Sequence, residues 1–353
     1  MYLVEIFPFF NGEIRWCFSP TILSTLPGEN LMTTTKRFNV AKTFQVDMPP
    51  KLEILGFADD THPQIPVVKP YRFRPDLLRA VIAYLHDAGG DALYLTGPTG
   101  AGKTSLITQL AARLNWPVQA VTCHGRMELS SLVGQFVLTN GSTQFVHGPL
   151  ATAVKEGHLL ILNESDLMDP AELAGLNDII EGQPLVIAEN GGEVIKPHPM
   201  FRLFATGNSA GSGDTSGLYQ GVLRQNLAFM DRFRVVHVDY PAPELEKAVV
   251  LAAVPAMQAD IIDKMLLVAA EIRRLFVGTD RDAPELTVTM STRTLVRWAY
   301  LSVMFRGAPY LFDYTLTQAL TARAEASQRE AIHRIAADIF GLYWRTHDVN
   351  AAL

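Results

Sequence analysis

Short apolar runs alternate with amphipathic segments along the middle of the chain. The first amphipathic segment has apolar residues at helical spacing: Leu77, Leu78, Val81, Ile82 and Leu85. Five apolar runs follow, and each predicts a strand: 92–96, 118–123, 158–162, 201–206 and 234–238. Helical segments separate them, and the first covers 103–114. Strands that alternate with helices predict an α/β fold with a parallel sheet and helices on both faces.

The pattern differs on either side of this region. Residues 47–75 are rich in proline and have few periodic apolar positions, which predicts an extended strap. Within 185–195, Asn190-Gly191 separates two β-rich stretches, and this is a strong hairpin signal. After residue 240 the strand-like runs stop. Three amphipathic stretches then predict helices: 244–277, 292–306 and 314–343.

A segment between the first predicted strand and the next helix fits G-x-x-x-x-G-K-[ST] at every fixed position. It consists of Gly97, Pro98, Thr99, Gly100, Ala101, Gly102, Lys103 and Thr104. Glycines allow backbone N–H groups to converge on phosphate oxygens, and the helix N-terminus adds a positive dipole. Lys103 suits the β- and γ-phosphates of ATP, and the Thr104 hydroxyl suits Mg²⁺. A glycine-rich turn without a ligand is the alternative, which the flanking strand and helix disfavour.

The apolar run 159–162 leads into the polar pair Asn163-Glu164. Glu164 is the candidate base that polarises the attacking water. P-loop NTPases usually have Asp-Glu at these two positions. We expect the neutral Asn163 to hold Mg²⁺ less firmly than a carboxylate would. Either hydrolysis survives on Glu164, which we favour, or turnover is slow. The apolar run 201–206 leads to Asn208. If Asn208 lies beside Glu164, it would hold the attacking water. An asparagine after a strand is otherwise a turn residue.

Composition excludes several classes of protein. The net charge of −6 gives no general electrostatic attraction to nucleic acid. The two cysteines, Cys17 and Cys123, are too few for a disulfide framework. No apolar stretch reaches the roughly 18–20 residues that span a membrane, and residues 1–10 lack the basic start of a signal peptide. We expect a soluble, cytoplasmic protein, and translation from Met32 is a further hypothesis.

Longer stretches resemble the MoxR-type AAA+ ATPases, and among them the CobS-type ATPase subunits of aerobic cobaltochelatase. The resemblance is carried by residues 111–117, 198–208, 213–219, 230–233 and 290–299. It implies a P-loop AAA+ core with a β-hairpin insertion, followed by a smaller all-helical lid domain, and it makes Asn208 the sensor-1 residue. The implied division is an N-terminal extension over 1–75, a nucleotide-binding domain over 76–240 and a lid over 241–353.

The resemblance also assigns roles to two arginines. Arg232 matches the position proposed as an arginine finger, which reaches the γ-phosphate held by the neighbouring subunit. A surface ion pair with Asp231 is its alternative role, and Arg224 and Arg234 are other candidates for the finger. Arg293 matches the sensor-2 arginine, which contacts ATP from the lid. Its alternative role is a solvated charge on a helix.

Two insertions fit the same family. Residues 129–148 resemble the insert in the second helix, and 185–195 resemble the hairpin before sensor 1. In the family these loops line or cap the ring and contact client proteins. We interpret His147, within the first insert, as a structural residue rather than a client contact.

The leading hypothesis is a motor that binds and hydrolyses Mg-ATP in an oligomeric ring, implied to be a hexamer, and remodels or activates a partner protein. The resemblance implies a partner with a von Willebrand A-type domain, similar to CobT. One alternative is a cobaltochelatase subunit that drives cobalt insertion into a corrin precursor. Another is a nucleotide-gated scaffold with little hydrolysis because of Asn163. A nucleic-acid motor is disfavoured by the acidic balance.

Overall fold

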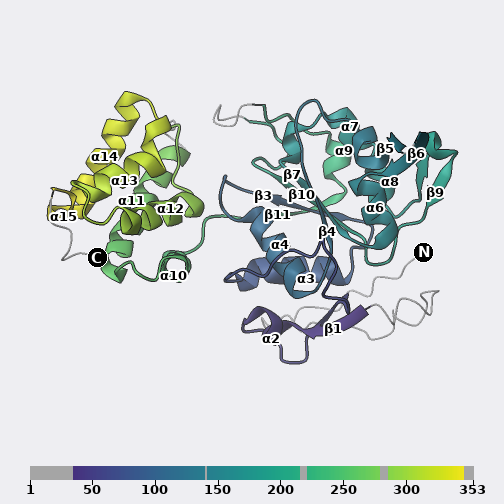
Figure 1. Cartoon of the computed structure of the whole chain (residues 1–353), viewed down its shortest axis with the longest axis horizontal. Coiled ribbons are helices and arrows are strands. Elements are labelled where there is room, and N and C mark those ends of the chain that lie inside the picture. Colours follow the sequence, from purple (N-terminus) through teal and green to yellow (C-terminus); the bar gives the residue numbers. More distant parts are fainter. Residues whose placement is uncertain (1–34, 140, 215–220, 279–284, 346–353) are drawn as a thin grey trace, which may run out of the picture.

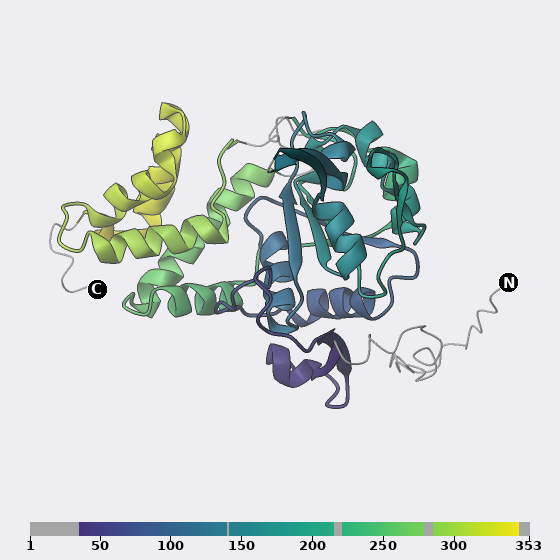
Figure 2. The same cartoon turned by 45° about the vertical axis from the view of Figure 1, so that its right-hand side comes forward.

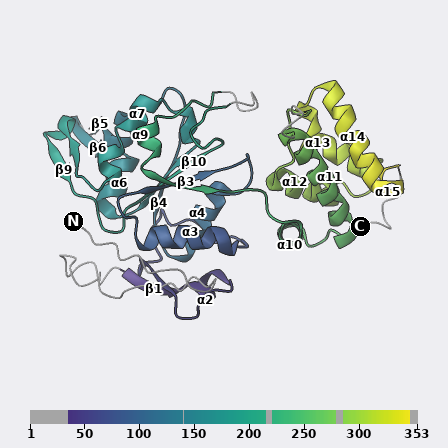
Figure 3. The same cartoon turned by 180° about the vertical axis from the view of Figure 1, so that it is seen from behind.

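The computed structural model describes residues 35–139, 141–214, 221–278 and 285–345. Cys17, Met32 and residues 215–219 of the family-like stretch 213–219 lie outside these ranges. An α/β body carries a group of helices at one side, joined to it by a single connection near Tyr240 (Figure 1). The view from behind shows the same two parts (Figure 3).

A five-stranded sheet forms the centre of the α/β body. In spatial order its strands are β11 (Phe233–His237), β3 (Ala92–Thr96), β10 (Arg202–Gly207), β7 (Leu159–Asn163) and β4 (Val118–Thr122). All four strand pairs are parallel. The central strands are almost wholly apolar because helices cover both faces. The predicted α/β fold with a parallel sheet is therefore confirmed.

Two hydrophobic cores lie on the two faces of the sheet. The first is formed with α3 (Pro75–His86) and α4 (Lys103–Arg113), whose apolar stripes are buried. The second is formed with four shorter helices: α6 (Pro149–Glu156), α7 (Pro170–Ala174), α8 (Asn177–Ile180) and α9 (Leu227–Met230). With a core on each face, the sheet is a rigid base for the loops at its carboxyl edge.

Residues 58–74, within the predicted strap, contain no helix or strand, and the described chain before them is a small antiparallel unit. It consists of β1 (Thr35–Asn39), α2 (Val40–Phe44) and β2 (Glu53–Phe57), and it lies beneath α3 in Figure 1. Phe44 and Ile54 are buried in the same core as α3 and α4. At Gly56 a Cβ atom would lie 2.3 Å from the Leu114 carbonyl oxygen, so this unit packs directly against the end of α4.

Two hairpins project from the second face. The first follows α5 (Leu129–Val133) and pairs β5 (Gly134–Thr139) with β6 (Ser142–His147). The second pairs β8 (Leu185–Ile187) with β9 (Glu193–Ile195) around a 3-10 turn, Ala188–Asn190, which confirms the predicted hairpin. The hairpins are joined side chain to side chain, because His147 Nε2 lies 2.7 Å from Glu193 Oε2.

The C-terminal helices pack around one core that contains Trp298, Phe312 and Phe340. They are α10 (Pro243–Ala253), α11 (Ala259–Val277), α12 (Thr292–Met304), α13 (Leu311–Ala319), α14 (Ala326–Phe340) and α15 (Leu342–Arg345), with a 3-10 turn at Thr321–Arg323. The predicted helix 244–277 is broken near Pro255, which cannot continue α10. The predicted helix 314–343 is likewise three helices. Figure 2 shows the green and yellow C-terminal helices beside the α/β body. None of the helices described has the length and apolar character that crossing a bilayer requires.

Candidate functional site

The loop between β3 and α4 has the backbone that a phosphate-binding loop needs. Gly97, Gly100 and Gly102 have φ angles of 141°, 73° and 96°, in a region that side chains strongly disfavour. Gly102 is the N-cap of α4, and no side chain caps that helix. The first N–H groups of α4 therefore remain directed toward the loop, together with the positive end of the helix dipole.

Lys103 is held at the centre of this loop by oxygen atoms only. Its Nζ donates to the carbonyl oxygens of Gly97 (2.5 Å) and Pro98 (3.1 Å), and to Asn208 Oδ1 (3.2 Å). Burial lowers the pKa of Lys103 to about 8, although the nearby carboxylates of Asp166 and Glu164 act in the opposite direction. The structure thus brings together Lys103 and Asn208, two residues that the sequence predicts for one site.

The ends of neighbouring strands bring the other predicted residues to the same edge. Thr104 Oγ1 donates to Asn163 Oδ1 at 2.6 Å, which connects the start of α4 to the end of β7. Glu164 follows directly and is exposed, with a left-handed backbone at φ 54°. Its N–H donates to Thr206 Oγ1 on β10 at 3.2 Å. Glu164 and Asn208 are therefore at adjacent strand ends, as the strand order requires.

Asp166 is a buried acid at this edge that sequence reasoning missed. It lies in the 3-10 turn Ser165–Leu167, is fully buried, and accepts a hydrogen bond from the N–H of Asn208 at 2.7 Å. Burial raises the pKa of Asp166, and the N–H groups of Asn208 and Ser209 lower it in part. An acidic residue two positions after Glu164 was the available signal, but no local pattern shows that a short turn buries it.

Arg232 lies at the opposite edge of the sheet from the P-loop. It directly precedes β11, whose five residues run parallel to β3 toward the carboxyl edge. Five strand residues span roughly 16 Å, so Arg232 is not brought to the phosphate loop of its own chain. Its guanidinium pairs with Glu181 at 2.6 Å, and Nη1 donates to the Ala228 carbonyl. The ion-pair partner is thus Glu181 and not Asp231, which was the partner in the alternative role.

The other two finger candidates have different surroundings. Arg234 is held in place, because it pairs with Asp91 at 2.7 Å and donates to the carbonyl oxygen of Ala88. Arg224 is exposed and lies in a short antiparallel bridge with Ser212. Arg234 thus resembles Arg232 in having its guanidinium bonded to a carboxylate and to a backbone carbonyl oxygen of its own chain.

The helical part reaches the phosphate loop at two points. A Cβ atom at Gly100 would lie 2.2 Å from Ser291 Cβ, so the N-cap of α12 packs on the loop. Arg293 is the second residue of α12 and is exposed. Tyr240, in the connection, donates its hydroxyl to the Thr99 carbonyl at 3.0 Å. Arg293 is thus close in sequence to a residue that touches the P-loop.

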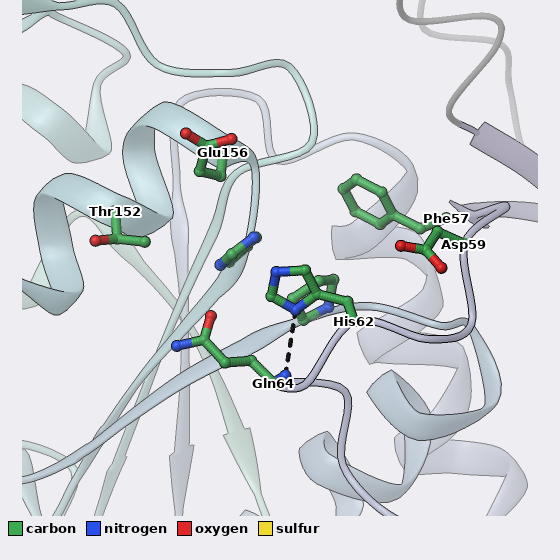
Figure 4. Close-up of a pocket in the computed structure, with 8 residues that line it drawn as sticks. Phe57, Asp59, His62, Gln64, Thr152 and Glu156 are labelled. Atoms are coloured by element: carbon green, nitrogen blue, oxygen red, sulfur yellow. Dashed lines mark hydrogen bonds between the residues drawn. The ribbon is translucent and has the colours of Figure 1, made fainter.

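A separate cavity of about 310 Å³ opens at the amino edge of the sheet. Figure 4 shows His62 and Glu156 on its wall, and Pro117 and His158, which precede β4 and β7, also line it. Burial, together with His62 and His198, lowers the pKa of His158 to about 4, so its ring is neutral near pH 7. This cavity is at the other end of the strands from the P-loop and is not the phosphate site.

Comparison with known proteins agrees with this geometry. Residues 92–233 match the family described as AAA domain (dynein-related subfamily), and residues 246–339 match the CbbQ/NirQ/NorQ C-terminal family. The chain is 32% identical over 297 residues to the aerobic cobaltochelatase subunit CobS of a Sinorhizobium species, across 81% of this chain and 86% of CobS.

Two further relatives share a smaller part of the chain. Midasin of Dictyostelium discoideum is 31% identical over 209 residues, which are 59% of this chain and 3% of midasin. The uncharacterized protein YojN of Bacillus subtilis is 30% identical over 200 residues, which are 56% of this chain and 62% of YojN. The P-loop geometry, the two family matches and the extent of the similarity to CobS show that the chain belongs to the MoxR-type AAA+ ATPases, close to CobS, and is a nucleotide-binding ATP hydrolase.

Proposed function

We propose that the chain is a cytoplasmic motor that hydrolyses Mg-ATP between neighbouring copies in a hexameric ring and remodels a partner protein. The observation that supports this most is the chain of contacts at the carboxyl edge of the sheet. Lys103 contacts Asn208 at 3.2 Å, and Thr104 contacts Asn163 at 2.6 Å. These residues come from α4, β7 and the loop after β10, and all of them suit a triphosphate site.

The residues present fit ATP and Mg²⁺. Phosphate oxygens would take over the bonds that Lys103 Nζ now donates to Gly97 and Pro98. Thr104 and Asn163 offer a hydroxyl and an amide oxygen, which are ligand types that Mg²⁺ accepts. When bound, Mg²⁺ neutralises charge on the β- and γ-phosphates. In this proposal the lysine binds the triphosphate, and the hydroxyl and amide hold the metal.

Glu164 and Asn208 act on the attacking water in this proposal. The Glu164 side chain is exposed at the edge where the P-loop lies, so its carboxylate is available as the general base. The side-chain oxygen of Asn208 already contacts Lys103, and its side-chain nitrogen, Nδ2, is a hydrogen-bond donor. Together these two residues would orient the water against the γ-phosphate.

Arg232 acts on the nucleotide of a neighbouring copy. Its place at the amino edge of the sheet keeps it from its own P-loop and favours action in trans. Its present ion pair with Glu181 is at the surface, where such pairs contribute only about 0–1 kcal/mol. The charge of a γ-phosphate would readily compete for this guanidinium, which stays protonated and forms two parallel bonds. Arg293 would contact ATP from the lid.

The test is complementation between two inactive variants. We expect Glu164→Gln and Arg232→Ala each to lower kcat by about 100-fold or more while ATP binding is kept. In a mixture of the two, the intact Glu164 of an Arg232→Ala copy faces the intact Arg232 of a Glu164→Gln copy, so part of the activity returns. Arg79→Ala, on the exposed side of α3, is the matched control. No return of activity in properly assembled mixtures, or full activity of a monomer, contradicts the proposal.

The similarity to CobS favours one class of partner. We propose a protein with a von Willebrand A-type domain, similar to CobT, and a role in driving cobalt insertion into a corrin precursor is the narrower alternative. Co-purification of such a partner with Glu164→Gln in ATP tests the pairing, and ATP-dependent cobalt insertion by the pair tests the narrower role. A nucleotide-gated scaffold, which Asn163 favours, would bind ATP without turnover even with the partner present.

A further inference from the structure

Asp166 makes contacts that the proposed mechanism does not yet use. Its Oδ2 accepts hydrogen bonds from the N–H groups of Asn208 (2.7 Å) and Ser209 (3.3 Å). Its Oδ1 accepts none from the residues that the structure describes. A fully buried carboxylate is costly unless it is hydrogen-bonded. The N–H groups of Asn208 and Ser209 therefore hold the Asp166 side chain in place. The same two hydrogen bonds fix the backbone after β10.

The packing around Asp166 leaves little freedom at the end of β10. A Cβ atom at Gly207 would lie 2.9 Å from Asp166 Oδ2 and 1.9 Å from the Tyr94 hydroxyl, so only glycine fits there. The backbone of Asp166 is fixed as well, because its carbonyl accepts from the N–H of Leu223 at 2.7 Å. The carboxylate is thus fitted directly against the strand end that leads into Asn208.

Asn208 is consequently held from two sides. Its N–H is bound by Asp166, and its side-chain Oδ1 contacts Lys103 Nζ at 3.2 Å. The turn that carries Asp166 is attached to β10 by two more bonds. Glu164 donates its N–H to Thr206 Oγ1, and Ser165 Oγ donates to the Thr206 carbonyl at 3.2 Å. The end of β7 and the end of β10 therefore form one hydrogen-bonded unit.

We propose that Asp166 is a positioning residue for ATP hydrolysis, which acts by fixing the backbone of Asn208 so that the Asn208 amide stays at the γ-phosphate end of Lys103. The inference rests on the role of Asn208 in the proposed function. It assigns Asp166 no contact with ATP or with the attacking water. Misplacement of a catalytic group by about 1 Å costs up to about 100-fold in rate, so a residue that sets this position has a large effect.

The test is a double-mutant cycle in the full-length chain with Mg-ATP. We expect Asp166→Ala to lower kcat by about 10- to 100-fold and to leave the Kd for ATP nearly unchanged. Asp166→Asn keeps an acceptor for both N–H groups, so it should lose about fivefold at most. In an Asn208→Ala background, Asp166→Ala should cause almost no further loss, because the group it positions is gone. Asp169→Ala, an exposed acid in the same loop, is the matched control.

Each outcome separates this inference from the proposed function. Wild-type kcat in Asn208→Ala alone contradicts the role of Asn208. A loss in Asn208→Ala that multiplies with the loss in Asp166→Ala contradicts the positioning role of Asp166 only. If Asp166→Ala does not fold, Asp166→Glu takes its place in the cycle, because one extra methylene moves the acceptor off the two N–H groups. Equal kcat losses for Asp166→Asn and Asp166→Ala also contradict positioning through these bonds.

Discussion

Asn163 is the residue at which this site departs most from the usual P-loop pattern. Its Oδ1 accepts the hydroxyl hydrogen of Thr104 at 2.6 Å, so the amide is oriented as an acceptor even though it has no charge. The geometry of the position is thus retained, and the negative charge is what differs. Having asparagine instead of aspartate at this position should therefore change the Mg²⁺ concentration that hydrolysis requires more than it changes the affinity for nucleotide.

We predict that Asn163→Asp lowers the Mg²⁺ concentration needed for half-maximal ATP hydrolysis by about tenfold, because a carboxylate adds charge beside the metal. The measurement is the ATPase rate against free Mg²⁺ at saturating ATP. Asn226→Asp is the control, since aspartate replaces asparagine well at the N-cap of α9. An unchanged Mg²⁺ requirement in Asn163→Asp would show that Asn163 does not lie at the metal.

Residues of the phosphate loop were predictable from the sequence because local backbone conformation fixes them. Gly97, Gly100 and Gly102 each have a positive φ, and Lys103 opens the helix as the pattern requires. Asp166 and Glu181 were not predictable in the same way. Their partners are 42 and 51 positions away along the chain, and only the folded sheet brings them together. The roles assigned to Glu164, Asn208, Arg232 and Arg293 remain predictions.

Elements were predictable where their apolar pattern was long and regular. Strand β3 has the predicted limits, and the Asn190-Gly191 turn lies in the predicted hairpin. The β1–β2 pair was missed, since five-residue strands with Gly56 near the end of one carry little periodic signal. The joining of the two hairpins was missed too, because His147 and Glu193 belong to separate insertions.

Glu193 connects these two hairpins, and we predict that Glu193→Ala lets them move independently. Its carboxylate accepts from Asn190 Nδ2 at 2.7 Å, contacts His147 Nε2, and lies 3.7 Å from Lys155 Nζ. Amide hydrogen exchange in β6 and β9 should become faster, while the free energy of unfolding changes little. Glu189→Ala, exposed in the same hairpin, should leave exchange unchanged. Unchanged exchange in Glu193→Ala would contradict the coupling.

At the scale of the whole molecule, one buried ion pair connects the lid with the phosphate loop. Arg273 on α11 forms two hydrogen bonds with Glu246 on α10, which also accepts from Thr292 on α12. The Arg273 guanidinium lies 4.0 Å from the centre of the Tyr240 ring, whose hydroxyl donates to Thr99 in the P-loop. A shift of the P-loop on nucleotide binding would thus be transmitted through Tyr240 and this ion pair to α10, α11 and α12.

We predict that Arg273→Ala destabilises the chain by about 3–5 kcal/mol, because it leaves the Glu246 carboxylate buried without a counter-charge. The Glu246 side chain is 2% exposed and that of Arg273 is 13% exposed. The adjacent Arg274 is the matched control. It pairs with Glu271 at the surface, so Arg274→Ala should change stability far less than Arg273→Ala does. Urea unfolding followed by circular dichroism measures both. Equal losses in the two variants would mean that the buried pair does not hold the lid helices together.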